Sequence, residues 1–238
     1  MYGRHELGQN FLTDKRVIDA VLACVGETDG PIVELGPGDG ALTVPLGRTG
    51  RPVTAVEVDP ARAARLRRRT SATVVEGDYL RFRFPREPHT VVGNIPFHIT
   101  TATLRMLLAQ PSWQDAVLVV QWEVARRRAG IGGATLLTAS WWPWYEFRVR
   151  SRVPARAFRP VPGVDGAIMT ATRRAAPLVD DRVGYQRFVK RVFTGRGRGL
   201  GEILTKAGYR HAARVVPRAA LPRDLTAQQW ARLWRLSS

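Results

Sequence analysis

Short apolar runs alternate with helical segments through the first half of the chain, and this alternation limits the possible folds more than any other feature. A helix is expected at residues 13–25, with Thr13 as its N-cap. Further helices are expected at 60–69, with Asp59 as N-cap and Pro60 at the first helical position, and at 101–108. The predicted strands are residues 32–35, 53–58, 73–76, 90–93 and 116–121. Strands and helices in this order indicate a doubly wound α/β domain with a mostly parallel sheet.

Four of the predicted strands end in a glycine or a polar residue. These residues are Gly36, Glu57, Asp78 and Asn94. Because the carboxyl ends of parallel strands meet at one edge of a doubly wound sheet, and ligands bind beyond that edge, we expect the four residues to surround one ligand.

A glycine-rich turn, from Gly36 to Gly40, follows the first of these strands. Glycine lacks a Cβ atom, so such a turn lets backbone approach a ligand closely. The carboxylate of Glu57, at the end of the next strand, is placed to accept hydrogen bonds from ribose hydroxyls. A nicotinamide cofactor would use the same two features, and a tight turn without a ligand is the simplest alternative. Glu34 before the glycines and Asp78 after the third strand favour S-adenosylmethionine instead.

An amine-acceptor motif, Asn94-Ile95-Pro96-Phe97, follows the fourth strand. An amide oxygen, a free backbone carbonyl and an aromatic face suit a planar exocyclic amine such as adenine N6. The amine would donate to the Asn94 side chain and the Ile95 carbonyl while the Phe97 ring stacks on the base. Taken alone, the tetrapeptide also fits an ordinary turn.

The charge indicates a polyanionic partner. The chain has 37 Lys and Arg against 20 Asp and Glu, a net charge of +17, and residues 187–238 hold 12 basic and 2 acidic residues. Binding of basic side chains to phosphates releases counterions, so nucleic acid is the expected partner. No apolar run is long enough for a membrane span, and we expect no membrane partner. The candidate RNA contacts are Lys190, Arg191, Arg196 and Arg198.

Cysteine and histidine usage is sparse. The single Cys24 cannot form an internal disulfide, which favours a reducing, cytoplasmic setting. The four histidines show no paired spacing, so no metal site is expected.

The pattern changes after residue 141. Extended segments are expected at 144–149 and 167–171, on either side of a proline-rich loop, and short amphipathic stretches follow. We therefore expect a catalytic domain over residues 1–174 and a small, basic, helical RNA-binding domain over residues 175–238.

The motif order over residues 5–172 resembles the rRNA adenine N6-methyltransferases. The resemblance is carried by Gly8-Gln9-Asn10-Phe11-Leu12, the glycine turn, the acceptor motif, and Phe158-Arg159-Pro160 with Val164-Asp165. It implies a Rossmann-like S-adenosylmethionine-dependent fold, with catalytic residues Asn94, Ile95, Pro96 and Phe97. It also implies that Phe97 and Phe158 stack on the substrate base. The implied cofactor contacts are Gln9, Asn10, Leu12, Gly36, Gly38, Glu57, Asp78 and Asn94.

Two branches of this family share these motifs. The Erm branch methylates an adenine of 23S rRNA and gives macrolide-lincosamide-streptogramin B resistance, whereas the other branch dimethylates adenines of 16S rRNA. Ile95 resembles the Erm form, because the 16S branch usually has leucine there, and the tryptophans at 141, 142 and 144 also resemble Erm proteins. His98 and Gly166 depart from the residues common in relatives. The resemblance implies 23S rRNA as the partner of a monomeric enzyme that adds one or two methyl groups.

Three rival interpretations remain at this point. The first is 16S rRNA dimethylation in ribosome biogenesis. The second is an RNA-binding or assembly factor without catalysis, although only chemistry requires both a donor site and an acceptor motif. The third is DNA adenine methylation, which usually needs a larger sequence-reading domain than the C-terminal region supplies.

Overall fold

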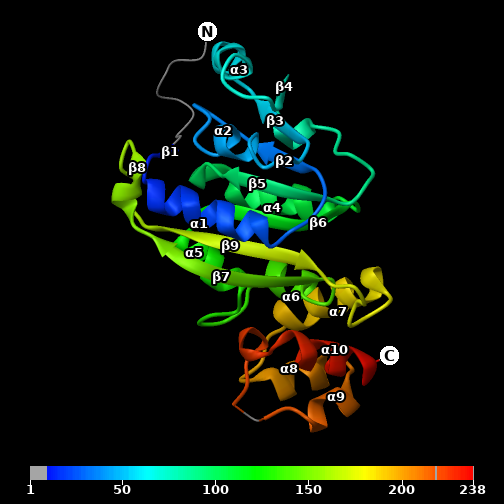
Figure 1. The fold of residues 1–238 in the computed structure, drawn as a ribbon. Helices are drawn as coiled ribbons and strands as arrows, with labels where there is room; N and C mark the ends of the chain where they lie inside the picture. Colours follow the sequence, from blue (N-terminus) through cyan, green and yellow to red (C-terminus); the bar gives the residue numbers. More distant parts are fainter. Residues whose placement is uncertain (1–9, 218, 238) are drawn as a thin grey trace. The chain divides into compact units, whose positions relative to one another are not determined.

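The computed structural model describes residues 10–217 and 219–237 and contains a central seven-stranded sheet (Figure 1). The strand order is β4-β3-β2-β5-β6-β9-β7. The pairs from β4 to β6 are parallel, and β9 pairs antiparallel with β6. This arrangement confirms the predicted α/β fold with a mostly parallel sheet. The strands are β2 Ile32–Leu35, β3 Val53–Glu57, β4 Thr73–Glu76, β5 His89–Asn94, β6 Trp113–Gln121, β7 Tyr145–Val153 and β9 Gly166–Arg173.

Helices connect these strands. Two N-caps illustrate how local sequence places them. Asp59 accepts hydrogen bonds from the backbone of Ala61 and Arg62 and starts α3 with Pro60 at its first position, as predicted. The first helix differs from the prediction, because Asp14 and not Thr13 caps it. The helices are α1 Lys15–Gly26, α2 Thr43–Leu46, α3 Pro60–Arg67, α4 Thr100–Ala109, α5 Trp122–Arg128, α6 Leu136–Trp141, α7 Arg182–Phe193, α8 Leu200–Lys206, α9 Arg210–Arg214 and α10 Ala227–Arg235.

A second, two-stranded sheet joins segments far apart in sequence. Strand β1 (Phe11–Leu12) pairs antiparallel with β8 (Phe158–Arg159). Thr13 extends the contact, since its backbone N–H and its hydroxyl both donate to the Ala157 carbonyl, at 2.9 and 3.2 Å. This explains why Thr13 does not cap α1: its side chain already has a partner. Sequence patterns did not predict either strand.

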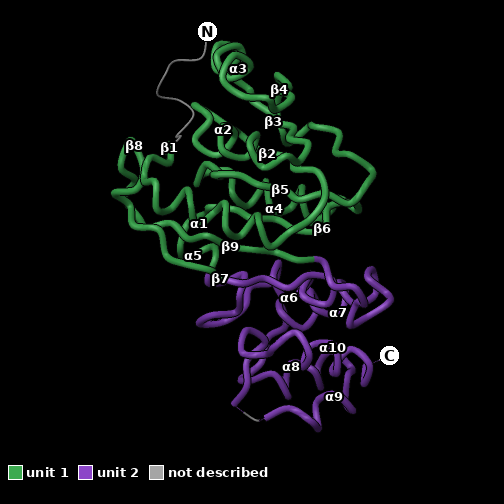
Figure 2. Tube along the Cα trace, in the orientation of Figure 1, with its two compact units in different colours: residues 1–125, 149–172 green, residues 126–148, 173–238 purple. Residues whose placement is uncertain are grey.

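The chain divides into two compact units (Figure 2). Unit 1 comprises residues 1–125 and 149–172, and unit 2 comprises residues 126–148 and 173–238. Residues 126–148, which the sequence suggested belong to the catalytic domain, therefore belong to the same unit as the C-terminal helices. Among the described residues, no helix has the length and apolar character needed to cross a bilayer.

A proline after α6 leaves carbonyl groups that α7 binds within unit 2. Pro143 has no N–H to donate to the Ala139 carbonyl one turn earlier, so α6 ends and leaves this carbonyl without a helical partner. The buried Tyr185 hydroxyl of α7 donates to the Ala139 carbonyl at 2.9 Å instead. Gln186 makes the equivalent bond to the Ser140 carbonyl at 3.2 Å. Helix α7 thus satisfies two carbonyls at the end of α6.

Candidate active site

Glycines open a cavity at the carboxyl edge of the sheet in unit 1. The turn after β2 contains Gly36, Gly38 and Gly40, all at positive φ. A Cβ atom at Gly38 would lie 2.9 Å from the Phe11 ring, so only glycine allows β1 to lie this close to the turn. The adjacent cavity has a volume of about 380 Å³, and residues of the turn, of the acceptor motif and of β1 line it.

Glu57 fixes one wall of this cavity. Its side chain is buried at the end of β3 and accepts hydrogen bonds from the backbone N–H groups of Gly38, at 2.8 Å, and Asp59, at 2.9 Å. One carboxylate therefore holds the glycine turn against the start of α3. The next residue, Val58, is 50% exposed and also lines the cavity. Sequence reasoning missed Val58, although its place beside Glu57 was the available signal.

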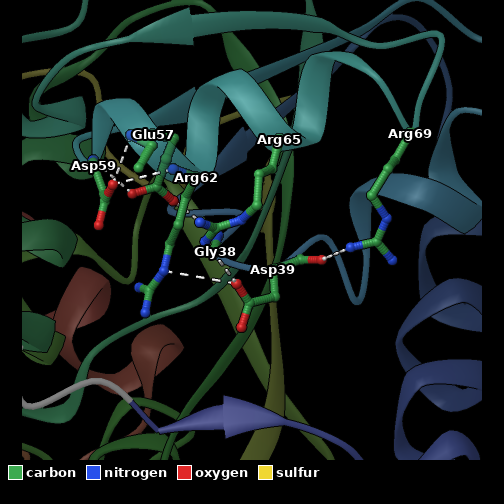
Figure 3. A network of polar contacts seen from close by, with 8 residues as sticks. Gly38, Asp39, Glu57, Asp59, Arg62, Arg65 and Arg69 are labelled. Atoms are coloured by element: carbon green, nitrogen blue, oxygen red, sulfur yellow. Dashed lines mark hydrogen bonds and ion pairs between the residues drawn. The ribbon is translucent and has the colours of Figure 1, made fainter.

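Arginines of α3, and Arg69 just after it, contact Asp39 in the glycine turn (Figure 3). Arg62 and Arg65 each approach the Asp39 carboxylate to 3.7 Å, and Arg69 donates to the Asp39 carbonyl at 3.2 Å. The Arg62 guanidinium also lies 4.4 Å from the centre of the Phe11 ring, a cation–π contact. The turn, α3 and β1 are thus connected through Asp39, Arg62 and Phe11.

The acceptor motif has a specific backbone requirement. A Cβ atom at Gly93 would lie 2.9 Å from the Ile95 side chain and from the Leu35 carbonyl, so glycine is needed for Ile95 to turn inward. Ile95 is buried, and its N–H donates to the Val119 carbonyl at 3.0 Å. This bond fixes the peptide plane between Asn94 and Ile95. The half-buried Asn94 lies at the cavity wall.

The N-terminal segment orients the Asn94 side chain. The Asn94 Nδ2 group donates to the Asn10 carbonyl at 2.7 Å, across 84 residues of sequence. Because the amide nitrogen is used in this bond, the Oδ1 atom is the end of the amide that remains to accept hydrogen bonds. The segment that covers the cavity therefore also orients the predicted acceptor oxygen.

The two predicted base-stacking aromatics differ in exposure. Phe97 is half-buried and lines the cavity, whereas Phe158 has no exposed surface. Their rings meet edge to face with centroids 5.9 Å apart. The sequence suggested that Phe158 offers a second stacking face, but in the structure β1 pairs with β8 and buries it. Phe158 instead supports Phe97.

A buried carboxyl group, Glu34, lies at the floor of the cavity. It is 2% exposed, and among the described residues its Oε2 atom has no hydrogen-bond partner. Burial raises the pKa of Glu34 to about 8, and the neighbouring Glu57 charge contributes in the same direction. Glu34 is thus largely neutral at pH 7 and presents an unpaired polar atom beside the cavity.

The other predicted site residues divide between the cavity and unit 2. Asn10, Leu12 and the exposed Asp78 line the cavity, and Asp78 caps a short 3₁₀ helix, Tyr79–Arg81. Gln9 lies outside the described residues. The four candidate RNA contacts are exposed in unit 2, and Arg191 also lies over the Tyr209 ring at 5.6 Å. Those four are Lys190, Arg191, Arg196 and Arg198.

Comparison with known proteins identifies the class of protein that carries this site. The chain belongs to the ribosomal RNA adenine dimethylase family, whose model matches residues 2–234. It is therefore an rRNA adenine N6-methyltransferase, which confirms the enzyme class predicted from the sequence. Its methyl donor is S-adenosylmethionine.

Three proteins of this family are similar to the chain in sequence or in structure. It is 53% identical to an rRNA adenine N-6-methyltransferase of Corynebacterium diphtheriae, over 88% of this chain and 85% of the relative. It is 53% identical to the mycinamicin-resistance protein MyrB of Micromonospora griseorubida, over 98% of this chain and 79% of the relative. The crystal structure of the 23S rRNA methyltransferase ErmE matches with a TM-score of 0.84 and 35% identity, covering 96% of this chain and 99% of ErmE.

The residues around the cavity fit S-adenosylmethionine. The glycine turn leaves room for close approach of a ligand, and the Glu57 carboxylate lies where ribose hydroxyls are expected. The Oε2 atom of Glu34 has no hydrogen-bond partner among the described residues, and a polar group of the ligand can supply one. When bound, S-adenosylmethionine supplies an electrophilic methyl group.

The Glu34 carboxyl group predicts a pH dependence of stability. Its pKa is about 8 in the folded chain and near 4.5 otherwise, so its neutral form favours folding below about pH 5 and this contribution is lost as pH rises toward 8. Glu34→Gln removes the ionisation. In urea unfolding of the ligand-free protein, we expect the free energy of unfolding of the variant to rise relative to that of wild type between about pH 5 and pH 8. The expected rise is up to about 1.4 kcal/mol per pH unit.

The matched control is Glu76→Gln, which removes an exposed carboxylate at the end of β4. We expect its unfolding free energy to follow the wild-type pH curve. Parallel curves for wild type and Glu34→Gln would contradict a neutral Glu34.

Proposed function

We propose that this enzyme transfers one or two methyl groups from S-adenosylmethionine to N6 of an adenine in 23S rRNA and thereby gives macrolide-lincosamide-streptogramin B resistance. The observation that carries the proposal is the Asn94 amide, whose nitrogen is bound to the Asn10 carbonyl so that its oxygen is left for the base amine. The choice of 23S rRNA is supported by Ile95 in the acceptor motif, by the similarity to ErmE and by a relative named a mycinamicin-resistance protein. The substrate implies action in the cytoplasm.

The chemistry requires the amine lone pair to become available, because it is delocalised into the adenine ring. The Asn94 Oδ1 atom and the Ile95 carbonyl accept the two N6 hydrogens, which favours a pyramidal nitrogen and offsets its developing positive charge. The bond from the Ile95 N–H to the Val119 carbonyl fixes the Asn94–Ile95 peptide, and the ring of Pro96 restricts the backbone after the Ile95 carbonyl, so little reorganisation is needed. Fixed dipoles of this kind are worth about 3–4 kcal/mol each in measured enzymes. The Phe97 ring, supported by Phe158, stacks on the base.

The cofactor contacts are assigned from the walls of the cavity. We assign Glu57 to the ribose hydroxyls and Asp78 to the adenine of the cofactor. The glycine turn contributes the backbone of Gly36 and Gly38. We assign Asn10, Leu12 and Asn94 to the methionine end of the cofactor. The sequence resemblance adds Gln9, which lies outside the described residues.

The role of the Asn94 amide predicts that its removal affects methyl transfer much more than binding of S-adenosylmethionine. We expect Asn94→Ala to bind S-adenosylmethionine within a few-fold of wild type but to reduce methyl transfer by at least about a hundredfold, the scale seen when one such dipole is removed. Calorimetry measures the first quantity and transfer of labelled methyl to rRNA measures the second. Turnover like that of wild type would exclude this role of Asn94.

Unit 2 supplies the proposed RNA-binding surface. The four candidate RNA contacts lie on α7 and in the glycine-rich segment before α8, and Glu202 accepts from the Arg198 backbone at 2.9 Å, which orders that segment. The arginines in and just after α3 contribute less, because Arg62, Arg65 and Arg69 already contact Asp39. We therefore assign the main phosphate contacts to Lys190, Arg191, Arg196 and Arg198.

If these four cations contact phosphates, replacing them by glutamine should make RNA binding weaker and less dependent on salt. The slope of log affinity against log salt should fall by roughly 0.7 to 0.9 for each phosphate that the variant no longer neutralises. The control replaces four exposed arginines of unit 1 by glutamine and changes the net charge equally, at Arg16, Arg48, Arg68 and Arg83. An equal change of slope in both variants would show only a general charge effect and would contradict the assignment.

Mapping of the methylated adenine tests the choice of RNA. In cells that express the wild-type protein, primer extension should stop at a new position in 23S rRNA, and the cells should tolerate macrolides. Cells that express Asn94→Ala should show neither effect. A stop in 16S rRNA instead would favour the small-subunit branch of the family.

A further inference from the structure

A short loop before β9 lies at the same edge of the sheet as the acceptor motif. In the sheet register Asn94 is opposite Val119, and Gln121 is opposite Gly166. Strand β6 therefore ends close to Asn94, and β9 starts where β6 ends. Residues 160–165, between β8 and β9, lie at the carboxyl end of β6, the edge of the sheet that also carries the acceptor motif.

Both ends of this loop contact the aromatic pair at the acceptor motif. The ring of Phe158, just before the loop, meets the Phe97 ring. A Cβ atom at Gly166, just after the loop, would lie 3.2 Å from the same Phe158 ring. Val161 is three residues beyond Phe158, so their Cα atoms are separated by at most about 11 Å.

The loop is held in one shape. The Asp165 side chain accepts from the Arg152 guanidinium and from the Ala155 backbone, both at 2.8 Å, and its carbonyl accepts from the Trp122 backbone at 3.0 Å. Pro160 and Pro162 fix two further φ angles. These constraints keep side chains on the loop in place before any partner binds.

Two apolar side chains of this loop point into solvent. Val161 is 55% exposed and Val164 is 51% exposed. Single exposed valines are ordinary, but two on one braced loop beside a base pocket form a small apolar projection. Two exposed arginines, Arg156 and Arg159, precede the loop, whereas the nearby Arg152 is held by Asp165. This combination suits a nucleic-acid strand, because the arginines can contact phosphates while the apolar tip contacts the stacked bases.

We propose that Val161 and Val164 form an apolar wedge that enters the base stack of the rRNA where the target adenine has left it. An enzyme that acts on a base must take that base out of its stack, at a cost in stacking energy. Apolar side chains inserted between bases stabilise such a distorted strand in other nucleic-acid complexes. Arg156 and Arg159 contact the phosphates on either side. The inference rests on the proposed function only in requiring an rRNA substrate.

The test uses the full-length protein and the rRNA fragment that the wild type methylates, with 2-aminopurine replacing the target adenine in one version. Binding of wild type should raise the 2-aminopurine fluorescence as the base leaves its stack. Val161→Ser with Val164→Ser should lose at least half of this rise at saturating protein. Its kcat on the folded fragment should fall about tenfold, while S-adenosylmethionine affinity stays unchanged.

Two further variants separate a wedge from a structural effect. Val161→Ile with Val164→Ile keeps the apolar tip and should retain both the fluorescence rise and kcat. Val183→Ser removes a valine that is 57% exposed on α7 of unit 2 and should behave as wild type. The proposal is overturned if the double serine variant matches wild type in fluorescence and kcat, or if Val183→Ser loses as much. The fragment is chosen because the wild type methylates it, whichever rRNA it comes from. Methylation of 16S rRNA would therefore contradict the proposed 23S target, but the wedge could still be tested on that fragment.

Discussion

The parallel register of the central strands is the constraint on which the rest of unit 1 depends. Leu35 pairs with Val56, and Glu34 pairs with Val92, so β2, β3 and β5 end side by side. This register brings the glycine turn, Glu57 and Asn94 around one cavity, although they are distant in sequence. A shift of one residue would turn the buried side chains toward the opposite face and separate these groups.

The N-terminal segment connects the two halves of the chemistry. Phe11 lies against the glycine turn at Gly38, while the Asn10 carbonyl holds the amide of Asn94. One short strand, fixed by its pairing with β8, thus touches both the donor side and the acceptor side of the cavity. Ordering this strand therefore stabilises the donor side and the acceptor side of the cavity together. Its pairing with β8 also fixes the start of the loop at residues 160–165.

The excess of positive charge has more than one use. Arg51 donates to the carbonyls of Gly30 and Asp29 and to the Thr90 hydroxyl, and therefore satisfies loop carbonyls of unit 1. The α3 arginines hold Asp39 in the same structural way. A net charge of +17 thus overstates the RNA-binding surface, because only cations that remain exposed and uncommitted can release counterions from phosphates.

The sequence alone determined the features that local chemistry controls. Strand periodicity, the glycines after β2, the Asp59-Pro60 cap and the acceptor motif could all be predicted, because each depends on residues within a few positions. Only the tertiary structure decided which distant groups meet. The pairing of β1 with β8 buried Phe158 and gave Thr13 another partner, and Tyr185 brought residues 126–148 into unit 2. The Thr13 and Tyr185 hydrogen bonds join residues that are 144 and 46 positions apart, and such contacts leave no periodic signal in the sequence.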